Sequence, residues 1–261
     1  MTEDNNLPIS TKWLVDSIGE VGRSLIDQIF MIYCPKTETK GTGFLYKSGH
    51  IITNWHVIEN CSENEVIAIS CKNERISFVE ILIDKEKDLA LLKPSIKING
   101  GLDFDNSCEI KPGIKISTWG YPLGYNGPAP LLSIGYISGF KDHQEKKDSP
   151  IIKHIVVNGA FNPGNSGGPL FIAGSDKLIG VVVNKHLPIP LYLSSALEAL
   201  AKNKSGLIFT RTDEKGNRED FAESQLVAEL LDHLKKLTQV MIGEAIDMSE
   251  VLDFLKKNKV E

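Results

Sequence analysis

Short apolar runs fill the middle of this chain, and glycine, proline, asparagine, aspartate and lysine separate them. The runs are too short and too closely spaced for the helices of alternating strand–helix units. Many short strands with turn residues between them are typical of a β-barrel or a β-sandwich. The expected strands are 29–33, 43–46, 50–53, 66–71, 76–83, 89–92, 114–119, 131–138, 151–158, 170–173 and 178–183.

Helical patterns occur at both ends of the chain. Apolar residues recur at helical spacing within 11–30, and 193–202 is expected to be a short helix. The polar stretch 211–220 is typical of a loop, and 221–237 follows it as an amphipathic helix. The leucine-rich stripe of 226–237 favours core packing over a partner surface. A last strand within 240–246 and a helix over 251–257 complete the expected elements.

Composition excludes several classes of function. The chain has 261 residues, a net charge of −5 and no long basic cluster, which argues against a nucleic-acid surface. No apolar stretch reaches the length of a membrane span. The polar, acidic start lacks the pattern of a secretory signal, which predicts a cytoplasmic location. The four cysteines form no Cys-x-x-Cys pair, so we expect no zinc site, and we expect reduced thiols.

The run Asn-Pro-Gly-Asn-Ser-Gly-Gly-Pro-Leu at 162–170 carries the clearest chemical signal. A serine attacks a carbonyl only if its oxygen is exposed, a base lies beside it and N–H groups face the developing oxyanion. Glycines around Ser166 permit the backbone angles that such a loop needs. The alternative is a glycine-rich turn in which Ser166 has no role.

Two further residues complete a candidate constellation. His56 follows a predicted strand, at the kind of position where loops carry chemistry, although it also fits a packed histidine. Asp88 begins the apolar strand 89–92, where a carboxylate needs a partner such as an imidazole N–H. We prefer Asp88 to Asp84, because Asp84 lies in a charged cluster and is expected to be solvated.

The chain order His56, Asp88, Ser166 matches one of the known orders of the serine triad. The motifs that carry a family resemblance are GTGFLY (41–46), TNWHVI (53–58), KDLALLK (87–93), WGYPLG (119–124) and NPGNSGGPL (162–170). They resemble the trypsin-like serine peptidases, in particular the HtrA/Deg branch. The resemblance covers roughly 25–185 and extends to 240–258.

The resemblance implies an all-β fold with added helices, in which two six-stranded antiparallel barrels pack together. The expected divisions are an N-terminal helical segment (1–28), a first barrel (29–110), a second barrel with a C-terminal helix (111–184 plus 240–261) and a helical insertion (185–239). The insertion replaces a short connection of the relatives. The PDZ domain of many HtrA proteins is not expected here.

The resemblance also implies roles for individual residues. Ser166 would be the nucleophile, His56 the general base and then acid, and Asp88 the group that orients the imidazole. The N–H groups of Gly164 and Ser166 would form the oxyanion hole. No metal and no organic cofactor are implied.

Specificity is weakly encoded. Ala160 would form the base of the pocket that receives the side chain before the scissile bond, and it offers no carboxylate for Lys or Arg. Small or medium apolar residues are therefore expected. Val183 and Lys185 would present backbone groups to an extended substrate, and Lys185 would favour an acidic residue only if it turned inward.

Partners and regulation follow from the same resemblance. Asn165 replaces an aspartate that pairs with a newly cleaved amino terminus in trypsin-type zymogens, so we expect no activation of that kind. The loops 123–132 and 141–150 are candidates for ordering on activation. A bacterial endopeptidase acting on proteins or peptides is the preferred interpretation, with a regulatory partner at 185–239 and an oligomer both compatible. The alternative is a catalytically silent member that binds peptides or proteins.

Overall fold

The computed structural model describes residues 11, 24–62, 64–104, 109–144, 148–159, 161–183, 191–204, 206–212, 216, 218–237 and 242–260. Its strands are β1 (Ile29–Cys34), β2 (Thr39–Leu45), β3 (Ile51–Thr53), β4 (Ile67–Ile69), β5 (Arg75–Ile76), β6 (Phe78–Asp84), β7 (Leu89–Pro94), β8 (Lys115–Gly120), β9 (Leu131–His143), β10 (Ile152–Gly159), β11 (Pro169–Ile172), β12 (Leu178–Val183), β13 (Ile208–Thr212), β14 (Arg218–Ala222) and β15 (Ile242–Asp247). Its helices are α2 (Trp55–Ile58), α3 (Leu191–Lys202), α4 (Glu223–Leu237) and α5 (Met248–Lys257).

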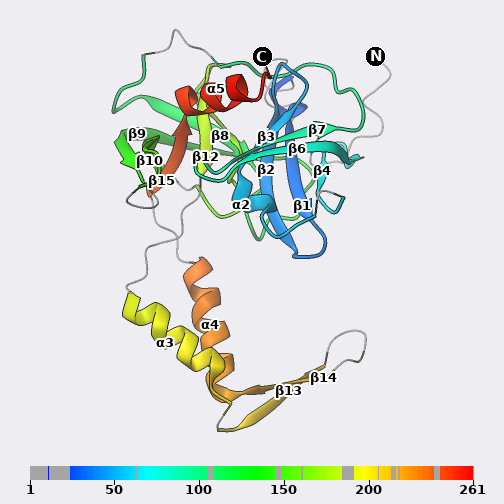
Figure 1. The fold of residues 1–261 in the computed structure, drawn as a ribbon, viewed down its shortest axis with the longest axis vertical. Helices are drawn as coiled ribbons and strands as arrows, with labels where there is room; N and C mark the ends of the chain where they lie inside the picture. The colour runs from blue at the N-terminus through cyan, green and yellow to red at the C-terminus, as the bar shows by residue number, and fades with distance from the viewer. Residues whose placement is uncertain are drawn as a thin grey trace. The chain divides into compact units, whose positions relative to one another are not determined.

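The chain divides into two compact units. The first comprises Met1–Lys185 and Met241–Glu261, and the second comprises His186–Val240. All residues of the candidate site that the structure describes belong to the first unit, which Figure 1 shows as a set of strands with α5 at their edge.

Two antiparallel sheets form the first unit, and the expected double-barrel fold is confirmed. The strands β10-β15-β12-β11-β8-β9 form a closed barrel. The other sheet has the order β5-β4-β1-β2-β3-β7-β6, so it has seven strands and not the six expected. Its two edges, β5 and β6, are separated in the chain by Ser77 alone. This single-residue break between edge strands brings the sheet close to closure.

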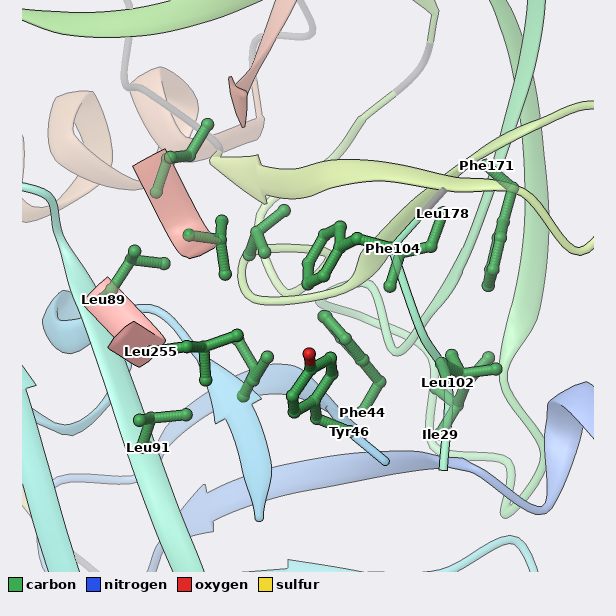
Figure 2. Packing of buried hydrophobic residues seen from close by; sticks show 14 of the residues in the cluster. Ile29, Phe44, Tyr46, Leu89, Leu91, Leu102, Phe104, Phe171, Leu178 and Leu255 are labelled. Carbon is green, nitrogen blue, oxygen red and sulfur yellow. The ribbon is translucent and has the colours of Figure 1, made fainter. Parts of the chain in front are cut away.

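Several strands are buried on both faces because the two sheets pack against each other. In β7, Leu89 and Leu91 lie in a cluster that spans both sheets, whereas Ala90 and Leu92 lie inside the first sheet. Successive side chains of a strand point to opposite faces, so two-sided burial explains why residues 89–92 of β7 are continuously apolar. Figure 2 shows this shared cluster, with Phe44 from β2 near residues of the second barrel.

Helix α5 is tied to the turn before β7. Lys87 Nζ lies 2.8 Å from Glu250 and 2.6 Å from Asp253, and its side chain is only 11% exposed. Burial alone would lower the pKa of Lys87, but the hydrogen bonds that it donates to Asp253 and Glu250 raise the pKa above its ordinary value. Asp84, at the start of the same turn, lies 3.7 Å from Lys257. The turn that leads to Asp88 is therefore held by charged groups of the C-terminal helix.

The cysteines differ from the sequence-based expectation. Cys34 at the end of β1 and Cys61 after α2 form a disulfide, so the expectation of reduced thiols is wrong for this pair. Disulfides are rare in reducing compartments, so this pair argues against the predicted cytoplasmic location. The location stays a prediction. Cys71 is free and buried, and burial raises the pKa of its thiol to about 12. Cys108 lies outside the described residues.

The second unit contains α3, α4 and the hairpin β13–β14. The loop expected at 211–220 is wrong in part, because Arg211 and Thr212 pair with Glu219 and Arg218 of β14. Polar strands that face solvent lack the apolar alternation by which strands are detected. The expected core packing of the leucine-rich stripe is wrong for Val227 and Leu230, which are 41% and 57% exposed.

None of the described helices is long and apolar enough to cross a membrane. Over the described residues, histidine, cysteine, aspartate and glutamate side chains do not gather in groups of three that would suit a metal ion. Of the N-terminal helical segment expected over 1–28, the structure describes Thr11 and 24–28; Thr11 and 24–26 are helical, and 27–28 form a turn.

The ion pairs of Lys87 give a first prediction. Lys87→Met should lower the free energy of unfolding by about 1–3 kcal/mol, because it leaves the half-buried Glu250 carboxylate without its cation. Since the folded-state pKa of Lys87 is raised, this contribution is complete below its ordinary pKa and is lost only as pH rises through the folded-state value. The deficit in urea unfolding should therefore be constant from about pH 6 to 9.

The matched control is Lys257→Met, because the Lys257 side chain is 72% exposed and its ion pair is 3.7 Å long. We expect a change within about 0.5 kcal/mol for this variant. Equal effects of the two substitutions would contradict the assignment of Lys87 as the residue that holds α5.

Candidate active site

His56 stands in the short helix α2, directly after β3. Strand β3 is fully buried and pairs with β7, with Thr53 opposite Ala90. This pairing brings the start of α2 next to Asp88, which immediately precedes β7. The position of His56 therefore follows from the register of two buried strands.

Asp88 binds His56 through both carboxylate oxygens. Oδ1 accepts a hydrogen bond from the His56 backbone N–H at 2.9 Å, and Oδ2 lies 2.7 Å from His56 Nδ1. Nδ1 therefore carries the proton and donates it, which leaves the lone pair of Nε2 for another partner. The side chains are 37% and 25% exposed, so this pair borders solvent.

The backbone of Asp88 is also fixed. Its φ is +53°, a left-handed conformation that aspartate tolerates better than most residues. Its carbonyl accepts bonds from Asn54 Nδ2 at 3.0 Å and from the Trp55 N–H at 3.2 Å. Residues 54–56 and Asp88 thus bind each other through four hydrogen bonds. The orientation of the imidazole is set by backbone as well as by side-chain contacts.

Asp84, the rival of Asp88, has a structural role. Its Oδ1 accepts the Lys87 N–H at 3.1 Å, and its side chain is only 11% exposed. The expectation that Asp84 is solvated is therefore wrong. Asp84 therefore stabilises the 84–88 turn that leads to Asp88, and among the described residues it does not bind His56.

Ser166 lies in the loop between β10 and β11, and this loop rests on the first sheet. The Ser166 carbonyl accepts the Thr42 N–H at 2.8 Å, and the Thr42 carbonyl accepts the Thr53 hydroxyl at 2.7 Å. Gly167 packs so closely on the Thr42 carbonyl that a Cβ atom would lie 2.1 Å from it. Because Thr53 lies two residues before the start of α2, which bears His56, Ser166 and His56 are anchored to the same strand ends.

Thr42 is the buried residue at the junction between the first sheet and two loops of the second barrel. Its hydroxyl donates to the Gly164 carbonyl at 2.7 Å and accepts the Tyr121 N–H at 3.0 Å. A fully buried threonine therefore satisfies backbone groups from two loops of the second barrel. Sequence analysis missed this role, although Thr42 lies in the motif GTGFLY.

The peptide between Pro163 and Gly164 is fixed from one side. The Pro163 carbonyl accepts the Leu123 N–H at 2.7 Å, and Gly164 has a φ of +96° that favours glycine. The carbonyl and N–H of one trans peptide point in opposite directions. The Gly164 N–H consequently points away from Leu123, as a donor to an oxyanion would have to.

Asn165 does not tie this loop down. The residue is 1% exposed, and within the part of the chain that the structure describes its Oδ1 and Nδ2 have no hydrogen-bond partner. The loop is instead held through its backbone, by Thr42 below and by Leu123 beside it.

Of the three residues expected to set specificity, the structure describes only Val183. Ala160 and Lys185 lie outside the described residues. Val183 ends β12 and is 1% exposed, with its side chain in the cluster shared by the two sheets. Only its backbone is therefore suited to meet a ligand.

The chain is similar to several known proteins. The family model "Trypsin-like peptidase domain" matches residues 41–181. Protease Do-like 1 of Arabidopsis thaliana chloroplasts is 32% identical over 148 residues, which are 54% of this chain and 32% of that protein. A probable periplasmic DegP-like serine endoprotease of Chlamydia pneumoniae is 32% identical over 136 residues, 52% of this chain and 27% of that protein. The chain thus spans about a third or less of these relatives.

Solved structures show the same fold. The active form of the Rv3671c protease from M. tuberculosis aligns with a TM-score of 0.55 and 21% identity, over 63% of this chain and 73% of that chain. The HtrA-type protease AlgW with a tripeptide aligns with a TM-score of 0.58 and 21% identity, over 90% of this chain and 60% of that chain.

Thr42 gives a prediction about stability. Thr42→Val should lower the free energy of unfolding by about 2–4 kcal/mol, because the buried Tyr121 N–H and Gly164 carbonyl each lose a partner. Thr42→Ser keeps the hydroxyl and should recover most of this loss. Chemical denaturation followed by tryptophan fluorescence measures the effect.

Thr118→Val is the matched control. Thr118 is also fully buried, but in the described residues its hydroxyl has no hydrogen-bond partner. Its replacement by valine should be neutral to within about 1 kcal/mol, or stabilising. If Thr118→Val destabilised the protein as much as Thr42→Val does, the loss in Thr42→Val could not be assigned to the hydrogen bonds of the Thr42 hydroxyl.

Proposed function

The chain belongs to the trypsin-like peptidase family, and we propose that it is a serine endopeptidase with Ser166, His56 and Asp88 as its triad. The observation that carries this proposal is the two-oxygen contact of Asp88 with His56, together with the anchoring of the Ser166 loop to Thr42, whose carbonyl binds Thr53 before α2. The substrates would be proteins or peptides.

The proposed reaction begins when the Ser166 hydroxyl attacks the carbonyl carbon of the scissile bond. His56 Nε2 takes the hydroxyl proton, and Asp88 stabilises the resulting imidazolium through the Nδ1–H. The negative oxygen of the tetrahedral intermediate accepts the N–H groups of Gly164 and Ser166. The intermediate collapses to an acyl-enzyme when Nε2 returns the proton to the departing amine.

Water completes the cycle by the same route. His56 Nε2 takes a proton from the water that attacks the acyl carbon, and a second tetrahedral intermediate forms. Its collapse breaks the bond to Ser166 Oγ, which recovers its proton from the imidazolium. The acid product leaves, and the site returns to its initial state.

Cleavage after small or medium apolar residues is part of the proposal. Ala160 would offer no carboxylate to pair with a lysine or arginine side chain, and the buried Val183 side chain leaves only backbone groups at that end of β12. An extended peptide would bind there by strand pairing. Regulation by a partner at 185–239 stays a prediction.

The rival function is a silent member of the family that binds peptides without cleaving them. The proposal predicts that a fluorophosphonate probe labels the purified protein and that Ser166→Ala abolishes the labelling. Peptidase activity should fall by about 10⁴–10⁶ in kcat for Ser166→Ala and for His56→Ala, which act as one unit.

The control is Ser138→Ala, which replaces an exposed serine outside the proposed site. This variant should be labelled like the wild type. Folded wild-type protein that takes up no probe and cleaves no peptide in a library would favour the rival function.

The pocket assignment gives a separate prediction. Ala160→Asp should introduce cleavage after Lys or Arg, because a carboxylate at the base of the pocket would pair with the cation. Digestion of a peptide library by wild type and variant measures the change in residue preference. An unchanged preference, with activity retained, would remove Ala160 from the pocket.

A further inference from the structure

Lys40 reaches from the first sheet to a loop of the second barrel. It is the second residue of β2, and its side chain is half-buried. Its Nζ donates to the Tyr125 carbonyl and, at 3.4 Å, to the Pro122 carbonyl. The proposed reaction makes no use of this residue.

The environment of Lys40 is unusual for a lysine. Among the described residues, no carboxylate lies within ion-pair distance of Nζ, so backbone carbonyls alone compensate its charge. Burial lowers the pKa of this ammonium below its ordinary value. Charge-assisted hydrogen bonds of this kind are stronger than neutral ones, so the contact can order a turn.

The turn that Lys40 binds is small. The Tyr125 N–H donates to the Pro122 carbonyl at 3.2 Å, and Gly124 between them has a φ of +83°. Leu123 within the turn is 53% exposed, so apolar packing contributes little to its order. Apart from its bond to the serine loop, the turn depends on its own hydrogen bond and on the Lys40 ammonium.

The same turn holds the peptide beside the serine. Its Leu123 N–H donates to the Pro163 carbonyl at 2.7 Å, and this bond directs the Gly164 N–H the opposite way. If the turn were released, the peptide could rotate and present its carbonyl in place of the N–H. A carbonyl oxygen there would repel the oxyanion.

We propose that Lys40 is a positioning residue that orders the turn 122–125 and thereby fixes the Gly164 N–H as an oxyanion donor. This inference rests on the proposed serine peptidase function. Lys40 touches neither the substrate nor the triad. Its loss should weaken transition-state stabilisation while leaving the His56–Asp88 contact and substrate binding in place.

The kinetic test compares Lys40→Met with Lys40→Arg. Lys40→Met should lower kcat by about 10²-fold, the range for loss of one oxyanion donor, with KM within about threefold of the wild type. Lys40→Arg keeps a charged donor and should recover most of the rate. The proposal is wrong if Lys40→Met keeps the wild-type kcat or if Lys40→Arg is as slow as Lys40→Met.

Lys36→Met is the matched control. Lys36 precedes β2, pairs with Glu65 at 3.6 Å, and its side chain is 65% exposed. The Lys36→Met variant should retain wild-type kinetics and stability. A kcat loss equal to that of Lys40→Met would indicate a general effect of removing a lysine and would overturn the proposal.

Leu123→Pro tests the other contact in this proposal, the hydrogen bond from the Leu123 N–H to the Pro163 carbonyl. It removes the N–H that binds Pro163, and proline suits the second position of a turn whose third residue, Gly124, has a positive φ. It should lower kcat as Lys40→Met does. Because both substitutions act through one bond, the double variant should be no slower than the slower single variant. Additive losses would overturn the proposed pathway.

Hydrogen exchange separates this inference from the peptidase proposal. In the folded protein, Lys40→Met should accelerate exchange of the Leu123 N–H and leave that of the Val182 N–H, bound to Gly168 at 2.8 Å, unchanged. Unchanged Leu123 exchange would overturn the inference even in a protein without activity. A wild type that is not labelled at Ser166 would overturn the peptidase proposal alone.

Discussion

Burial of strands on both faces is the constraint on which this structure depends. The residues of β7 and β12 alternate between the interior of their own sheet and the cluster shared by both sheets. Neither sheet can cover that second face alone, and burial of such apolar area is the main favourable contribution to folding. The two sheets must therefore pack together, and the loop that bears Ser166 lies at their contact, bound to Thr42 of the first sheet.

Close packing of the sheets traps backbone polar groups, and those groups have to be paired. Thr42 pairs three of them: it binds the Gly164 and Ser166 carbonyls and the Tyr121 N–H. Lys40, two residues earlier in β2, pairs two carbonyls of the neighbouring turn. One strand of the first sheet thus positions two loops of the second barrel. The groups that stabilise the junction are the groups that shape the serine loop.

Charged groups fix the other half of the site. Lys87 joins α5 to the turn that ends at Asp88, and Asp88 then holds His56 by two oxygens. Asp88 adopts a left-handed backbone conformation there, which surrounding contacts must maintain. The C-terminal helix is distant from Asp88 in sequence, yet it supports the residue that orients the imidazole.

The sequence by itself determined the approximate places of most buried strands, the order His56, Asp88, Ser166 and the glycines around the serine, because these are local patterns. It misread Asp84 as solvated, 211–220 as a loop and Cys34 with Cys61 as reduced thiols, since each depends on partners distant in the chain. Only the tertiary structure decided that Thr42 and Lys40 support the serine loop. The bonds of Thr42 and Lys40 span about eighty residues or more, and no local pattern encodes which backbone groups will be trapped when two sheets meet.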